Sequence, residues 1–106
     1  MSYIYLMESI RDYDTMCKIG FSKNPKNRIN NIQTGNDGQI NIVYTFESKY
    51  GRKLESSLHK LYSHKHKNME WFNLNIEDVL NFLPICQKIE KSFDILKENK
   101  NPHIYD

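Results

Sequence analysis

The stretch YIYLMESIRDYDTMCKIGF, residues 3–21, decides the fold. Its two ends, residues 3–7 and 17–21, alternate in β-forming side chains, and the segment between them is polar like a loop. The stretch therefore predicts a β-hairpin. Because side chains alternate across a strand, we expect Tyr5 and Lys18 to point away from the core on one outer face of the sheet, close to each other.

The next elements follow directly in the chain. Asn24-Pro25 has the residues of a helix start, and Gly35 is expected to end that helix. Residues 40–46 alternate as a third strand. On this strand the predicted common face consists of Ile42, Tyr44 and Phe46.

Helical spacing of apolar residues dominates the rest of the chain. A second helix is expected from near Gly51, and Trp71-Phe72 is expected as a short extended piece. Asn75 is the predicted cap of a third helix, which Pro84 interrupts before a last helix. The apolar stripe of the second helix is Leu54, Leu58, Leu61 and Tyr62, and that of the last helix is Ile85, Ile89, Phe93 and Leu96.

The predicted fold is α+β: a small three-stranded antiparallel sheet flanked by helices. The chain has 106 residues, which suits one domain. We expect residues 1–74 to form its core and residues 75–106 a C-terminal helical extension of the same domain. No apolar run of about 18 residues and no secretory leader are present, so we expect an intracellular protein without membrane contact. Cys17 and Cys86 match no zinc or redox spacing and are expected to be buried thiols.

Basic residues are concentrated in two stretches although the net charge is only +2. Residues 15–36 carry four basic side chains and no acid, and residues 48–69 carry six basic side chains and one acid. Such segregation indicates a surface that faces a polyanion, and ordinary solvated charge is the alternative. The lysines predicted to bind nucleic acid are Lys23, Lys26, Lys60 and Lys65.

Three sets of residues are candidates for chemistry. A lysine beside Tyr5 would favour the phenolate by charge attraction, which is a route to a general base. Glu55 is the single acid of the second basic stretch, and His59 lies one turn further on the same helical face. A carboxylate among cations suits Mg²⁺, whereas a helix-surface glutamate in i, i+4 pairs is the alternative. Arg28 can present its planar fork to a phosphate.

Taken in order, these motifs resemble the GIY-YIG endonuclease superfamily, and the pattern is most similar to its phage and large-DNA-virus branch. Tyr3-Ile4-Tyr5 is similar to the first signature tripeptide and Lys18-Ile19-Gly20 to the second. Arg28 falls eight residues after Gly20, where the family has its arginine, and residues 54–59 resemble the helix that carries the metal-binding glutamate. The chain departs from the signature at Tyr3, where the family has glycine, and at Lys18, where it has a second tyrosine.

The resemblance implies an endonuclease that hydrolyses phosphodiester bonds of nucleic acid, with DNA favoured, using Mg²⁺ or Mn²⁺. It implies that Tyr5 accepts a proton from water, that Lys18 tunes this base, that Arg28 stabilises the transition state and that His59 assists. Glu55 would hold the metal ion.

Two other functions stay open at this stage. The first is a nucleic-acid-binding module with weak or no catalysis. The second is a virus-encoded interaction domain with a protein partner. The acidic final helices with their apolar stripe would suit such a partner, or the contact of a homodimer.

Overall fold

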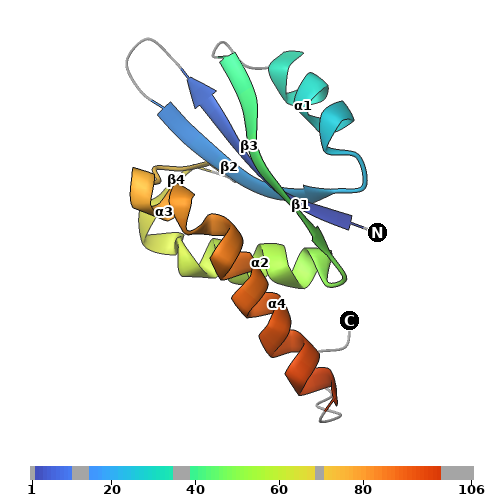
Figure 1. The fold of residues 1–106 in the computed structure, drawn as a ribbon. Helices are drawn as coiled ribbons and strands as arrows, with labels where there is room; N and C mark the ends of the chain where they lie inside the picture. Colours follow the sequence, from blue (N-terminus) through green and yellow to red (C-terminus); the bar gives the residue numbers. More distant parts are fainter. Residues whose placement is uncertain (1, 11–14, 35–38, 69–70, 99–106) are drawn as a thin grey trace.

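A computed structural model describes residues 2–10, 15–34, 39–68 and 71–98 of the chain. The described strands form one sheet with the order β3-β1-β2-β5-β4, and Figure 1 shows the helices around it. In chain order the elements are β1 (Ser2–Ile10), β2 (Thr15–Ser22), α1 (Pro25–Thr34), β3 (Gln39–Ser48), α2 (Gly51–Leu61), the 3-10 turn η1 (Ser63–Lys65), β4 (His66–Asn68), β5 (Trp71–Phe72), α3 (Ile76–Leu80) and α4 (Phe82–Glu98).

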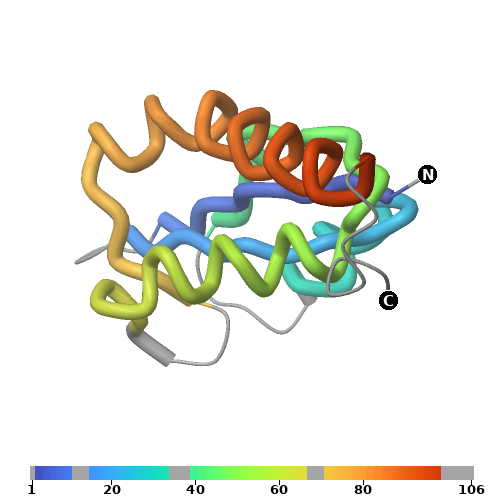
Figure 2. Tube along the Cα trace, turned by 90° about the horizontal axis from the view of Figure 1, so that it is seen from below, coloured from blue at the N-terminus to red at the C-terminus, as the bar shows by residue number. Residues whose placement is uncertain are grey.

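A layer of helix lies on each face of the sheet. α2 and α4 lie side by side on one face, as Figure 2 shows, and their buried side chains form the larger apolar core. α1 covers the opposite face, where Ile29 and Ile32 pack against a smaller apolar cluster. The larger core contains Ile4, Leu6, Cys17, Ile19, Leu54, Leu58, Tyr62, Phe72, Phe82 and Cys86, and the smaller one contains Tyr5, Met7 and Ile40.

The expected hairpin and helix starts are present. β1 pairs antiparallel with β2, in a register that places Tyr5 opposite Gly20 and Met7 opposite Lys18. At the start of α1 the side chain of Asn24 accepts a hydrogen bond from the backbone N–H of Asn27 at 3.2 Å. Asn75 caps α3 in a reciprocal capping box, as its sequence position predicts.

The α+β class is confirmed, but the prediction of three strands was wrong, because the sheet has five. β5 pairs with β2 through Cys17–Phe72 and Lys18–Trp71, and β4 adds to the far side of β5. β4 spans three residues and β5 two. Strands this short carry no alternation of apolar and polar side chains, so the pattern that marks longer strands is absent from them.

The predicted common face of the third strand was also wrong. The pairing of β1 with β3 shifts register between Leu6 and Met7, because Leu6 lies opposite Tyr44 and Met7 opposite Ile42. This bulge places one extra residue, Val43, in β3 and reverses the alternation. Ile42 therefore packs on the α1 face, whereas Tyr44 packs on the α2/α4 face together with Phe46.

Pro84 does not mark the helix break. α3 ends at Leu80 and α4 begins at Phe82, so the chain turns at Asn81 and Pro84 lies within the first turn of α4. A proline is tolerated there because the first N–H groups of a helix have no intrahelical acceptor. The predicted apolar stripe of the last helix is confirmed for Ile85, Ile89 and Phe93, which pack against the larger core, but was wrong for Leu96, which is exposed.

Cys17 and Cys86 are buried, and both are free thiols as predicted. Burial raises the pKa of Cys17 to about 11, with a smaller effect of Glu8, and raises the pKa of Cys86 to about 12. The described residues contain no helix long and apolar enough to cross a membrane.

Candidate active site

The candidate site lies along one edge of β2. On its first side β2 pairs with β1 over its whole length, but on its second side β5 pairs only with Cys17 and Lys18. From residue 19 to residue 22, no described strand pairs with this second side. Backbone groups at such an edge are available to side chains and ligands. We call residues 19–22 the open edge of β2.

His59 is fixed to this open edge. Its Nε2 lies 2.7 Å from the carbonyl oxygen of Ile19, and its ring meets the ring of Phe72 edge-on at 5.1 Å between centroids. A carbonyl oxygen only accepts, so Nε2 carries the proton and donates this hydrogen bond. The neutral form of His59 then has an acceptor at Nδ1, which suits a helper that contacts a water molecule or, when protonated, a phosphate.

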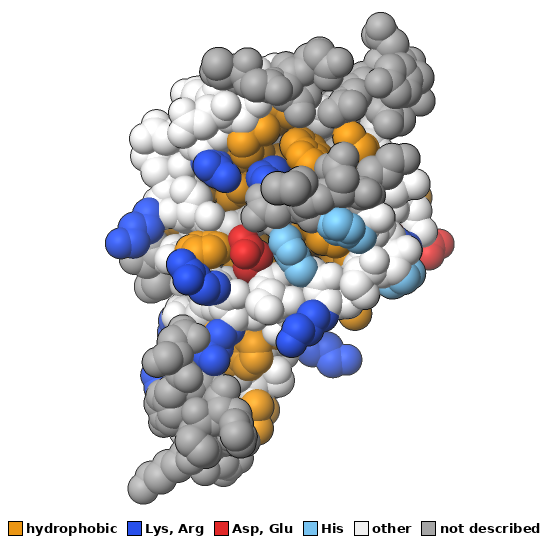
Figure 3. All heavy atoms as spheres, turned by 180° about the vertical axis from the view of Figure 1, so that it is seen from behind, with side chains coloured by type: hydrophobic (Ala, Val, Ile, Leu, Met, Phe, Trp, Pro, Cys, Tyr) orange, Lys and Arg blue, Asp and Glu red, His pale blue; other side chains and the backbone are white. Residues whose placement is uncertain are grey.

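Glu55 lies on α2 one turn before His59 and is half-buried. One turn earlier still, the Arg52 guanidinium lies 5.6 Å from the centre of the Phe21 ring. Because Arg52 contacts Phe21 and His59 contacts Ile19, the stretch of α2 between them lies along Gly20. Residues three and four apart share a helical face, so Glu55 lies between a cation and a histidine on that face. Figure 3 shows a face of the molecule on which an acidic side chain lies among basic and histidine side chains.

Tyr5 reaches the same place from the other side of β2. Its ring crosses Gly20, because a Cβ added at Gly20 would lie 2.6 Å from Tyr5 Cζ and closer still to the phenolic oxygen. Real Cβ atoms essentially never approach so closely, so glycine is required for this arrangement. Because Gly20 has no side chain, the Tyr5 phenol can extend from β1 over β2, toward the open edge of β2.

Tyr5 and Lys18 share a face of the sheet as expected, but the prediction that this face points outward was wrong. Tyr5 is 1% exposed and Lys18 is 7% exposed. The reason is that α1 covers this face with Ile29 and Ile32. Lys18 lies opposite Met7, two pairs along from the Tyr5–Gly20 pair, and its ammonium group is 5.7 Å from the centre of the Trp71 ring. That distance is within the range of a cation–π contact.

α1 brings further cations toward the end of the open edge. Lys23 lies directly after β2 and Lys26 in the first turn of α1, and both side chains are exposed. Arg28 is exposed and precedes Ile29, whose side chain packs with Tyr5 in the smaller apolar cluster. The three basic residues therefore follow the strand end that leads away from Gly20.

The two remaining predicted lysines lie in different surroundings. Lys60 is exposed at the end of α2, where it lines a hollow of about 520 Å³ between α2 and α4. Lys65 instead forms an ion pair with Asp78, whose carboxylate also accepts the backbone N–H of Asn75 at 3.0 Å. Desolvation raises the pKa of Asp78, but the hydrogen bonds from Lys65 and Asn75 outweigh it and hold this pKa below its usual value. Lys65 therefore anchors the start of α3.

Among the predicted site residues, Glu55 is the carboxylate that could hold a metal ion. In the described part of the chain no three His, Cys, Asp or Glu side chains form a group that could hold a metal ion. Mg²⁺ is commonly bound through one or two carboxylates together with substrate phosphates, and it retains several waters. Glu55 beside the open edge fits this mode, in which the substrate completes the coordination.

Sequence reasoning missed the residues that support the site. Phe72 lies between two histidines, since the His66 ring also meets it edge-on at 5.4 Å. Arg52 was counted as surface charge although it stacks on Phe21. Gly20 was noted as part of a motif, but its contact with the Tyr5 ring follows only from the strand register. The Trp71-Phe72 pair was the available signal, because aromatic residues are enriched in strands.

Comparison with known protein families gives a match over most of the chain. No curated protein and no solved structure matches the chain. Residues 2–94 match the T5orf172 domain, which is found in phage proteins and is associated with GIY-YIG-like and other nuclease-related families. The match covers β1 through most of α4, and therefore both the open edge of β2 and the helices around it. The chain belongs to the T5orf172 domain family.

Proposed function

We propose that the protein is a metal-dependent endonuclease of GIY-YIG type that hydrolyses phosphodiester bonds of DNA. The observation that carries this proposal is the convergence at Gly20, where the Tyr5 phenol crosses β2 and α2 runs alongside with Glu55 and His59. A potential base, a potential metal ligand and a histidine thus lie around one short strand segment, and family membership supports a nuclease-related role.

Glu55 is the proposed ligand of a single Mg²⁺ or Mn²⁺ ion. When bound, such an ion polarises a phosphoryl oxygen and assists the departure of the leaving group. The basic side chains around Glu55 make the local charge positive, and this charge attracts the phosphate of a substrate. Glu55 would therefore hold the ion at the place to which the phosphate is drawn.

Four side chains of the protein have the other catalytic roles in this proposal. The Tyr5 hydroxyl takes a proton from the attacking water, and the positive charge of Lys18 on the same face favours the phenolate form. Arg28 stabilises the extra negative charge of the transition state from α1, as a positioned cation does for developing negative charge. His59 is held by Ile19 and contacts the phosphate through its other ring nitrogen.

Exposed cations provide the path for the nucleic acid. Lys23 and Lys26 lie at one end of the open edge, and Arg52 lies along α2 beside Phe21. Phosphate contacts of this kind position the substrate without selecting sequence. We place Lys60 at the far end of this path and leave Lys65 out of it, because its charge is paired with Asp78.

One observation favours a second candidate, a binding module with little catalysis. The Tyr5 side chain is 1% exposed, and a general base must reach a water molecule. In that case the basic surface binds nucleic acid, and Tyr5 and Lys18 fill the space beneath α1.

The direct test is cleavage of a panel of nucleic acids by the whole chain. The panel contains duplex, branched, nicked and single-stranded DNA and single-stranded RNA, each with Mg²⁺, with Mn²⁺ and with a chelator. The proposal predicts cleavage of at least one DNA that requires the added metal. Binding without cleavage under every condition would favour the second candidate, and absence of both would overturn the nucleic-acid function.

A further inference from the structure

α2 begins without a cap of its own. Tyr50 occupies the position before the helix and makes no side-chain capping hydrogen bond, and no acid lies in the first turn. The first N–H groups of a helix have no intrahelical acceptors and normally need such a cap. The segment that leads into α2, residues 48–50, is instead held from elsewhere in the fold.

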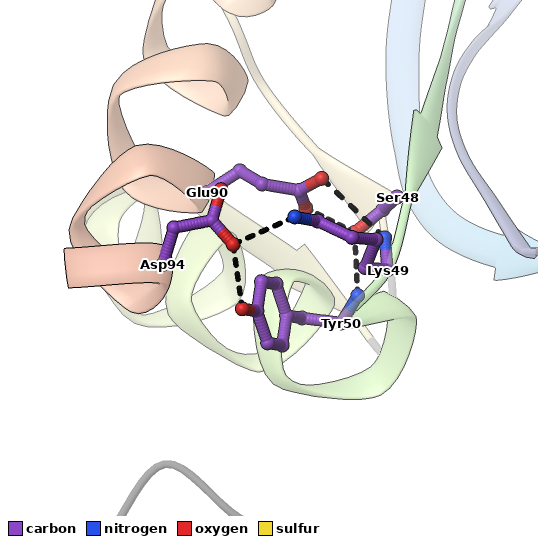
Figure 4. A network of polar contacts seen from close by, with 5 residues as sticks. All are labelled: Ser48, Lys49, Tyr50, Glu90 and Asp94. Carbon is purple, nitrogen blue, oxygen red and sulfur yellow. Dashed lines mark hydrogen bonds and ion pairs between the residues drawn. The ribbon is translucent and has the colours of Figure 1, made fainter. Parts of the chain in front are cut away.

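Glu90 of α4 holds this segment, as Figure 4 shows. Its carboxylate accepts a hydrogen bond from the Ser48 hydroxyl at 2.5 Å and from the backbone N–H of Lys49 at 3.4 Å. The Ser48 oxygen in turn accepts the backbone N–H of Tyr50 at 3.0 Å. Glu90 is 9% exposed and Ser48 is 2% exposed, so these hydrogen bonds are shielded from water.

Asp94, one turn further along α4, engages the same junction from outside. It accepts hydrogen bonds from the Tyr50 hydroxyl at 2.7 Å and from the Lys49 ammonium group at 2.8 Å. The hydrogen bond to Asp94 is the main reason that the pKa of Tyr50 is raised to about 12. The Tyr50 ring also meets the Phe93 ring edge-on at 5.4 Å. Residues 48–50 are thus held to α4 by backbone and side chains together.

We propose that Glu90 is a positioning residue of the active site, acting through Ser48 and the start of α2. The inference rests on the proposed function. Glu55 and His59 follow Gly51 on one rigid helix, so a rotation or shift at its start moves both side chains relative to Gly20. A displacement of about 1 Å can reduce a catalysed rate by about a hundredfold, so the anchor matters more for rate than for binding.

The proposal also gives α4 a role that the signature motifs do not supply. Those motifs end near residue 74, whereas Glu90 and Asp94 lie in the last described helix. Glu90 and Asp94 of α4 hold residues 48–50 and thereby position α2, the helix that carries the proposed metal ligand Glu55. The proposed DNA-binding residues Lys23 and Lys26, before and in α1, do not depend on it, because α1 packs on the opposite face of the sheet.

The test uses three variants of the whole chain and one control. Glu90→Leu keeps a large buried side chain but removes both acceptors, and Glu90→Gln keeps the shape and one acceptor. Ser48→Ala removes only the hydroxyl that links Glu90 to the Tyr50 N–H. Glu98→Gln is the matched control, because it removes the same charge from an exposed position of the same helix.

Two measurements are made on each protein. Amide hydrogen exchange reports the start of α2 whether or not the protein is a nuclease. Single-turnover cleavage is compared with affinity for the same DNA, measured without divalent metal. We expect Glu90→Leu to speed exchange in the first turn of α2 by at least about tenfold while the β1–β2 hairpin is unchanged. We expect its cleavage to slow by at least about tenfold with affinity within about twofold of wild type.

The variants should form a series. Glu90→Gln is expected to lie between Glu90→Leu and wild type in both measurements, and Glu98→Gln to match wild type. If Glu90→Leu does not fold, Ser48→Ala decides by the same criteria with a smaller effect. Unchanged amide exchange at the start of α2 in Glu90→Leu would overturn the proposal. A cleavage rate and a DNA affinity that both fall in proportion to the folded fraction of the variant would also overturn it. If the wild-type protein cleaves nothing, the proposed function fails, and exchange alone decides whether Glu90 positions α2.

Discussion

On the α2/α4 face of the sheet β1 buries Ile4 and Leu6, whereas on the α1 face β1 and β2 bury Tyr5, Ser9 and Lys18. The apolar face gains free energy with every side chain covered. The α1 face instead buries hydroxyl and ammonium groups, which is costly unless each has a suitable partner. The comparison shows an apolar core on the α2/α4 face and, on the α1 face, buried polar side chains that include Tyr5 and Lys18, to which the proposed function assigns roles.

The largest expected effect is on the cleavage rate, which a change on the α1 face of the sheet should reduce and a matched change on the α2/α4 face should not. Tyr5→Phe removes one oxygen from the α1 face, and we expect single-turnover cleavage to fall by about 10²–10⁴, the usual contribution of a general base. Stability in a denaturant titration should change little. The matched control is Tyr44→Phe, on the α2/α4 face, which should cleave like wild type. Equal rates for the two variants would remove Tyr5 from the mechanism.

The next largest effect is on the free energy of unfolding, which a change in the larger core on the α2/α4 face should lower without a matching loss of rate. Phe82 is fully buried in the larger core, and Phe82→Ala should lower the free energy of unfolding by about 3–5 kcal/mol. The rate per folded molecule should stay within a few-fold of wild type, because Phe82 contacts none of the proposed catalytic groups. Denaturant titration with active-site counting measures both quantities. A large rate loss in the folded fraction would mean that the two faces are not separable.

Lys18→Met tests whether the buried cation on the α1 face tunes the base. Without the positive charge the phenolate is less favoured, so the rising alkaline limb of the pH–rate profile should move to higher pH. The rate should therefore fall at neutral pH and recover at high pH. The profile is measured under single-turnover conditions. An unchanged profile would assign Lys18 to packing against Trp71 only.

The smallest effect concerns the exposed cations. Lys23→Gln combined with Lys26→Gln should lower the slope of log affinity against log salt by about 2 on duplex DNA, since each phosphate contact contributes about 0.9. Lys91→Gln combined with Lys97→Gln, on exposed positions of α4, removes the same charge as a control. Equal slopes for the two double variants would show that the interface lies elsewhere.

Much of the fold was predictable because long elements carry strong local signals. The hairpin, the Asn24 and Asn75 helix starts and the helix at Gly51 all follow from alternation, capping residues and helical spacing. The extended piece at Trp71-Phe72 was predicted and forms β5, whereas β4 was not predictable, because three residues carry no period. The reversal at Ile42 was not predictable either, since a bulge depends on the pairing with β1.

The candidate site was predictable in its residue types and less so in its surroundings. Position in the sequence put Glu55 and His59 on one helical face, and α2 has them there. The covering of Tyr5 and Lys18 by α1 depends on tertiary packing, which strand alternation does not contain. The role of Glu90 was hidden for the same reason, because its partners Ser48 and Lys49 lie about 40 residues earlier in the chain.

The central claim is that Glu55 holds the metal ion beside Gly20, and one comparison tests it most directly. Metal-dependent single-turnover cleavage and metal-free affinity are measured for wild type, Glu55→Gln and the exposed control Glu47→Gln. The account predicts that Glu55→Gln loses at least about a hundredfold in rate, because the metal contributes several kcal/mol of charge stabilisation. Its affinity for DNA should be kept or improved, since a negative charge near the phosphates is gone. Cleavage by Glu55→Gln at the wild-type rate would contradict the account.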